Sequence, residues 1–113
     1  MKTNRKNIHY RQGDVLIERI EAMPAKRTAI PRENGRVILA HGEVTGHAHA
    51  IVDEKCDLYA SPEAPMGVTY LEIKQAVAAL KHDEHSTIEL PEGKYRVTRQ
   101  REYSPEVIRN VAD

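Results

Sequence analysis

Histidine is the residue type with the clearest chemical potential in this 113-residue chain, which has six His but no Phe and no Trp. Three of them, His41, His47 and His49, lie within HGEVTGHAH, and His82 and His85 lie within HDEH. Alternate side chains of a β-strand share one face, so His47 and His49 are expected to project together, roughly 6–7 Å apart at the backbone. Two imidazoles at that spacing can bind one metal ion.

The spacing of His82 and His85 is compatible with a turn that directs both rings the same way. Gly42 and Gly46 allow a bend that brings His41 back toward the other histidines of its segment. Acidic residues lie near both clusters in the sequence: Glu43, Glu54, Asp83 and Glu84. Imidazole together with carboxylate suits Zn, Fe, Mn, Ni or Cu, and the sequence does not choose among these metals. The other interpretation is that the histidines lie on the surface or in the core with no joint role.

Composition limits the classes of protein to consider. Lys+Arg and Asp+Glu both number 17, so the formal net charge is zero, which argues against a globally basic nucleic-acid binder. No apolar run is long enough for a membrane helix, and the polar N-terminus has no hydrophobic signal segment. With Cys56 as its only cysteine, the chain has no internal disulfide, and we expect a cytoplasmic protein. Cys56 is either a soft metal ligand or, more often for such a residue, part of the core.

Short segments of β-type periodicity follow one another along the chain. The segments expected to be strands are residues 14–20, 36–40, 47–52, 56–60, 67–73, 87–90 and 94–102, while Ala76–Leu80 suits either a strand or a helix. Turns are expected at Asn34-Gly35 and at Pro91-Glu92-Gly93. Ser104 and Pro105 predict the start of a short helix over residues 104–113.

These elements predict one mainly β domain over residues 1–113, a small sandwich or barrel of about seven to eight short strands. Residues 1–11 are expected to be flexible. Without Phe or Trp, the core must come from Val, Ile, Leu, Ala, Met and some of the five Tyr. A chain of this length can bury roughly 65% of its unfolded surface, so it can fold alone.

The first histidine segment resembles the metal motif of the cupins, in which two histidines one residue apart are followed by a glutamate. Here Gly42 precedes His47-Ala48-His49, and Glu54 follows them, but Ser61 stands at the closing glycine position. The second cupin motif is matched only at Pro91-Glu92-Gly93, because Arg96 replaces the histidine ligand and Gln100 the asparagine. The resemblance implies a small jelly-roll with His47, His49 and Glu54 as ligands. The remaining ligand is then His82 or His85, unless Arg96 makes the site an anion-binding pocket.

The first functional hypothesis is therefore a divalent-metal site that contains His47 and His49. Its other ligands come from His41, Glu54, His82 and His85, and the nitrogens of His47, His49 and either His82 or His85 should lie near one point. If the protein is an enzyme, the metal polarises a small-molecule substrate or activates water, with Glu43 or Glu84 as general base. Whether it is an enzyme stays open. His9 is expected to take no part.

The C-terminal strand supports a second hypothesis. Its alternation places Tyr95, Val97, Arg99, Arg101 and Tyr103 on one face, and Arg96 on the other. Residues Arg96, Arg99, Arg101 and Tyr103 are candidates for binding an anion, nucleic acid or a protein partner. The simpler interpretation is a solvated edge strand whose charges prevent aggregation. A third possibility is a homo-oligomer whose histidines line an interface.

The segment HGEVTGHAHA and the tail RQREYSPEVIRNVAD also resemble a small bacterial and phage-associated family of unassigned function. This resemblance carries no activity to transfer; the second hypothesis is a non-enzymatic module, accessory to a larger bacterial or phage assembly.

Overall fold

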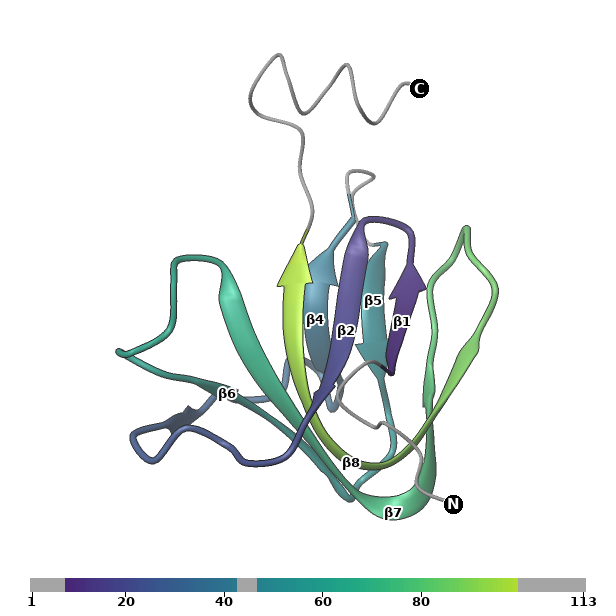
Figure 1. The fold of residues 1–113 in the computed structure, drawn as a ribbon. Helices are drawn as coiled ribbons and strands as arrows, with labels where there is room; N and C mark the ends of the chain where they lie inside the picture. Colours follow the sequence, from purple (N-terminus) through teal and green to yellow (C-terminus); the bar gives the residue numbers. More distant parts are fainter. Residues whose placement is uncertain (1–7, 43–46, 100–113) are drawn as a thin grey trace.

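The computed structural model describes residues 8–42 and 47–99, which form eight β-strands and no helix (Figure 1). The prediction of a mainly β fold with about seven to eight strands is confirmed for this part of the chain, whereas the helix predicted over residues 104–113 lies outside it. No helix in the described part is long and apolar enough to span a membrane. The strands are β1 His9–Gln12, β2 Val15–Ile20, β3 Thr28–Ala29, β4 Val37–His41, β5 Ala48–Ile51, β6 Cys56–Ala60, β7 Val68–Leu80 and β8 Ile88–Arg99.

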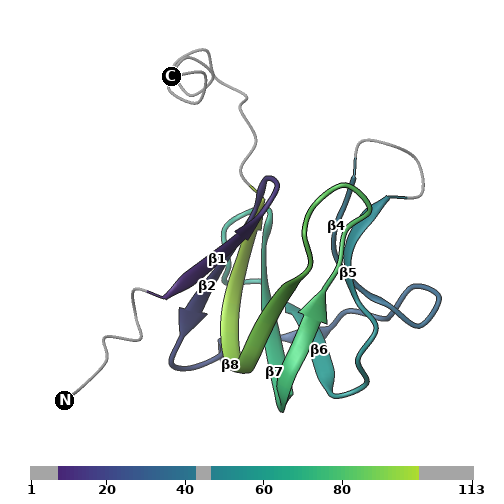
Figure 2. The ribbon, with the colours of Figure 1, turned by 90° about the vertical axis from the view of Figure 1, so that its right-hand side faces the viewer.

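Six strands form an antiparallel sheet in the order β1-β2-β8-β7-β6-β3, and β4 and β5 form a separate hairpin. Because β1 and β3 are the two edges, the large sheet is open and does not close into a barrel. Figure 2 shows the β4–β5 hairpin facing the β1–β2 side of the sheet, with the bent β7 and β8 between them. The hairpin is joined to the sheet at the end of β7, where Ala50 and Lys81 form a β-bridge.

The space between these layers is filled mainly by aliphatic side chains, as the composition predicts. Tyr95 is the one aromatic side chain in the buried core of the described residues, and its ring meets that of Tyr10 edge-on. Cys56 is fully buried, and burial raises the pKa of its thiol to about 11. The other core residues are Val15, Ile17, Val37, Ile51, Leu58, Leu71, Ile73, Ala78, Leu80, Leu90 and Val97.

Two long strands, β7 and β8, bend together and form the curved floor seen in Figure 1. In the first half of β7 the side chains buried in the core are those of Leu71 and Ile73, and in the second half they are those of Ala78 and Leu80. Odd-numbered residues therefore face the core before the bend, and even-numbered residues face it after the bend. The switch occurs where the pairing with β8 shifts register, between Ile73 and Val77. A bulge of this kind restores the inward face after a bend, because side chains of a strand otherwise alternate strictly.

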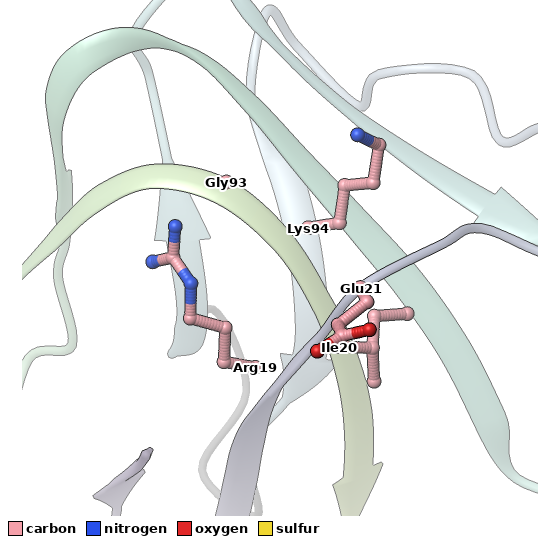
Figure 3. Close-up of a pocket in the computed structure, with 5 residues that line it drawn as sticks. All are labelled: Arg19, Ile20, Glu21, Gly93 and Lys94. Carbon is pink, nitrogen blue, oxygen red and sulfur yellow. The ribbon is translucent and has the colours of Figure 1, made fainter. Parts of the chain in front are cut away.

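The expected turn at Pro91-Glu92-Gly93 is wrong, because these residues continue β8 through the bend. Gly93 has φ of +154°, and a Cβ at this position would lie 2.7–2.9 Å from the guanidinium of Arg19. Figure 3 shows Arg19 reaching up to Gly93 beside a shallow hollow. Arg19 donates hydrogen bonds to the Tyr95 hydroxyl and to the Glu92 carbonyl, at 3.1 and 2.9 Å. Glycine is therefore needed here for the backbone angle and for the close approach of Arg19.

Other local expectations had mixed outcomes. The Asn34-Gly35 turn is confirmed, with φ of +55° and +78° for its two central residues. Ala76–Leu80, which suited either structure, belongs to strand β7. The flexible segment expected over residues 1–11 stays a prediction, although β1 begins at His9 and pairs with β2. This pairing also buries Gln12.

Candidate functional site

Four histidine rings gather beside β5, and they are called the four-histidine cluster here: His47, His49, His82 and His85. The ring centroids of His49 and His82 lie 4.2 Å apart, and those of His82 and His85 lie 4.7 Å apart. His85 is 6.0 Å from His49, and His47 is 6.1 Å from His82. The two sequence segments that are rich in histidine therefore meet in space.

The bridge between β5 and the end of β7 brings the two segments together. Ala50 and Lys81 exchange both backbone hydrogen bonds, each 2.9 Å long. In an antiparallel pair, the residue before Ala50 lies opposite the residue after Lys81, so His49 faces His82. Ala48 and Ala50 are both buried, and both line a hollow that His82 also borders.

His49 is the buried centre of the cluster, and Gln12 determines its protonation pattern. The Gln12 side-chain amide donates to the carbonyl oxygens of Leu80 and Ser86, both at 2.9 Å. Its oxygen, left as an acceptor, lies 2.8 Å from His49 Nδ1. Nδ1 must therefore carry the ring proton, and Nε2 presents its lone pair.

The lone pair of His49 Nε2 faces a carboxylate. Nε2 lies 3.7 Å from Asp14 Oδ1, while Asp14 Oδ2 accepts a 2.9 Å hydrogen bond from Arg99 Nε. Burial lowers the pKa of His49 to about 4; nearby His82 also lowers it, and Asp14 opposes the shift. At neutral pH two acceptors thus face one another across this distance. This arrangement suits a bridging cation.

His47 contributes a second unsatisfied nitrogen. Its buried Nδ1 has no hydrogen-bond partner among the described residues, although Glu84 Oε2 lies 3.5 Å away. His82 is engaged differently, because its Nδ1 accepts a 3.0 Å hydrogen bond from the Glu84 backbone amide. Within residues 8–42 and 47–99, no group of three or more His, Cys, Asp or Glu side chains is arranged to hold a metal ion. The rings have gathered, but their nitrogens do not converge on one point.

Three other predicted site residues lie apart from the cluster or outside the described chain. His41 is exposed, with Nε2 3.3 Å from Glu33 Oε1. Glu54 is exposed in the turn after β5, where its carbonyl accepts a hydrogen bond from Arg32. Glu43 lies outside the described residues.

The residues proposed for anion or nucleic-acid binding are divided between two environments. Tyr95 and Val97 are buried, so the face of β8 that they share with Arg99 points into the core. Arg96 lies on the other face and binds Glu18 at 2.7 Å. Arg101 and Tyr103 lie outside the described residues. The interpretation of this segment as an edge strand is wrong, because β8 lies between β2 and β7.

The low pKa of His49 predicts a pH-dependent stability. The folded protein takes up the His49 proton near pH 4 and the unfolded chain near pH 6.5, so the free energy of unfolding should fall as the pH drops through this range. The loss attributable to His49 should reach about 3 kcal/mol at its low-pH end. Urea unfolding in the presence of chelator should show that the free energy of unfolding falls less on acidification in His49→Gln than in the unmodified protein. His41→Gln should behave like the unmodified protein. An identical slope in all three would contradict the prediction.

Comparison with known proteins places the chain in a family. The sequence profile of a family described as a domain of unknown function, DUF8820, matches residues 11–100. The chain belongs to this family. The DUF8820 match includes the whole four-histidine cluster together with Gln12, Asp14 and Arg99, and it leaves out His9. No curated protein and no solved structure matches the chain.

The residues that sequence reasoning missed come from the turn between β1 and β2. Gly13 has φ of +61°, and a Cβ there would lie 2.8 Å from His85 Nε2 and 3.2 Å from His49 Cε1. Its neighbours Gln12 and Asp14 hold His49 from two sides. The Gly-Asp pair signals a turn, but nothing local links that turn to a histidine 37 positions later.

Proposed function

We propose that this protein binds one divalent transition-metal ion at the four-histidine cluster, with Asp14 as the neighbouring carboxylate. The observation that carries the proposal is the unprotonated Nε2 of His49, which faces the Asp14 carboxylate across 3.7 Å. Among the described residues, the buried Nδ1 of His47 has no hydrogen-bond partner, and it lies 3.5 Å from Glu84 Oε2, so it is a second candidate ligand atom. A low pKa keeps His49 neutral at physiological pH, which is the form that a metal requires.

Binding requires side-chain rearrangement. His82 must turn away from the Glu84 amide that now donates to it, and the ring nitrogens of the cluster must turn toward one point. The segment that carries His82 and His85 is suited to this change, because residues 83–87 are exposed. The hydrogen bond that would orient His49 toward the ion is already present, because Gln12 fixes its tautomer.

The donor set is rich in imidazole and therefore suits Zn, Fe, Mn or Ni. Such an ion supplies Lewis-acid chemistry when bound. The proposal concerns binding; a reaction, a small-molecule substrate and a role for Glu84 as base stay predictions. The cupin resemblance also stays a prediction. The two histidines of the cupin-like motif lie in the cluster, whereas Glu54 is exposed in the turn after β5.

The direct test measures how much metal the protein binds and with what affinity. Protein stripped with chelator should take up about one equivalent of Zn²⁺ or Ni²⁺, measured by calorimetry and plasma mass spectrometry. Metal at about 100 times its Kd should raise the free energy of unfolding by about 2.7 kcal/mol. Absence of stoichiometric uptake, with no gain in stability from Zn, Fe, Mn or Ni, would overturn the proposal.

The alternative of an accessory module that binds nucleic acid or a protein partner has no specific support in the described residues. Arg96 is paired with Glu18, and Arg99 is paired with Asp14. The expectation of a homo-oligomer likewise stays a prediction. Salt-sensitive binding to nucleic acid that is lost in an Arg99→Ala and Arg101→Ala double variant, but not in His47→Ala, would revive the nucleic-acid alternative.

A further inference from the structure

A cavity of about 500 Å³ opens between the β4–β5 hairpin and the large sheet. We infer that this cavity binds a small aliphatic monocarboxylate, whose carboxylate group is held by Arg99. As a site for the substrate of the proposed metal centre, the inference rests on the proposed function. The binding itself does not need the metal and can be tested without it.

The walls of the cavity are mainly aliphatic. Leu39 and Ala40 of β4 form one side, and residues of β2, β7 and β8 form the other. Met66 at the rim has a fully exposed side chain, which is unusual for a large apolar residue and adds a flexible hydrophobic surface. A volume of this size lies within the range of small-molecule pockets. The other lining residues are Val15, Gly67, Val68, Thr69, Val97, Thr98 and Arg99.

The charge of the cavity points to an anion. Among the described residues that line it, Arg99 is the single ionisable one, and its side chain is mostly buried, with 22% exposed. Its Nε is bonded to Asp14, while its terminal nitrogens have no partner among the described residues. A guanidinium edge of this kind matches a carboxylate, and the aliphatic walls match an unbranched chain. By contrast, the hollow beside Gly93 in Figure 3 is lined by Arg19, Lys94 and Glu21, so it carries charges of both signs.

Two residues that line the cavity, Ala40 and Arg99, connect it to the four-histidine cluster. Ala40 lines the cavity and is the cross-strand partner of His49. Arg99 lines the cavity and donates to Asp14, whose other oxygen faces His49. A carboxylate bound to the terminal nitrogens of Arg99 would therefore lie beside the proposed metal ligands. This placement makes a carboxylate the substrate class that the site would accept.

The test is a titration of the full chain with octanoate in the presence of chelator, followed by calorimetry and by methyl NMR. Octanoate should bind and shift the methyl signals of Leu39, Val68 and Val97. Acetate, which lacks the long aliphatic chain, and octanol, which lacks the carboxylate, should each bind at least about 10-fold more weakly. Arg99→Gln should weaken octanoate binding at least about 10-fold. Met66→Ala, at a fully exposed side chain that should not affect folding, should weaken it several-fold.

Arg96→Gln is the matched control, because Arg96 is on the same strand but pairs with Glu18 outside the cavity. It should leave octanoate binding unchanged. Lack of binding by the folded, metal-free protein, equal affinity of Arg99→Gln and unmodified protein, or equal binding of octanol and octanoate would each overturn the inference. Metal uptake is measured in a separate experiment. If octanoate does not bind, the proposed metal site is unaffected. If metal does not bind, the carboxylate site can still stand, but it is no longer the substrate site of a metal centre.

Discussion

Replacing His82 and His85 together with alanine is expected to lower the affinity for Zn²⁺ or Ni²⁺ by about 100-fold or more, equivalent to about 2.7 kcal/mol. The change removes two of the four imidazoles whose rings lie 4.2–6.1 Å apart. His85 is exposed and His82 is half-buried, so the metal-free variant should unfold at nearly the same urea concentration as the unmodified protein. Calorimetric titration of both stripped proteins measures the difference.

The matched control for this variant is His9→Ala with His41→Ala, which removes the same number of histidines from outside the cluster. His41 is exposed and interacts with Glu33. The control should keep the affinity of the unmodified protein. Equal losses in the two double variants would mean that metal binds exposed histidines at random, and the four-histidine cluster would lose its assignment.

Replacing Gln12 with leucine is expected to destabilise the metal-free protein by about 3 kcal/mol. The variant leaves three groups without their partner: the carbonyls of Leu80 and Ser86 and the Nδ1–H of His49. Each buried polar group that loses its only partner costs about 1–3 kcal/mol, and partial access of water to the Ser86 side reduces the sum. Urea unfolding measures the change.

Gln12→Leu should also release the His49 tautomer. In the unmodified protein, nitrogen NMR should show the ring proton on Nδ1, and in the variant a substantial fraction should move to Nε2. Metal affinity should then fall about 10- to 100-fold, as for other residues that orient a metal ligand. Gln75→Leu is the control, because the Gln75 amide donates only to the nearby Val77 carbonyl at the surface. An unchanged tautomer in Gln12→Leu would show that Gln12 has a structural role alone.

Much of the fold could be predicted from alternation of apolar and polar residues. Strands β2, β4, β5 and β6 were expected within one or two residues of their bounds. The long strands β7 and β8 were each expected as two pieces, because Pro91, Gly93 and the Ala-rich segment weaken the local β signal. Pairing across the bend overrides that weakness: Val77 pairs with Pro91 and Ile73 pairs with Gly93. Local periodicity cannot reveal a strand that changes its inward face halfway along.

The site shows the same division between local pattern and long-range pairing. By itself, the sequence determined a mainly β chain with an aliphatic core, two histidine-rich segments, and a strand in which His47 and His49 can share a face. The tertiary structure decided that His82 faces His49, that His41 lies apart with Glu33, and that Gln12 and Asp14 hold His49. The physical reason is that side-chain direction within a strand follows from local geometry. The partner across the sheet depends on backbone pairing between residues far apart in the chain, such as Ala50 with Lys81.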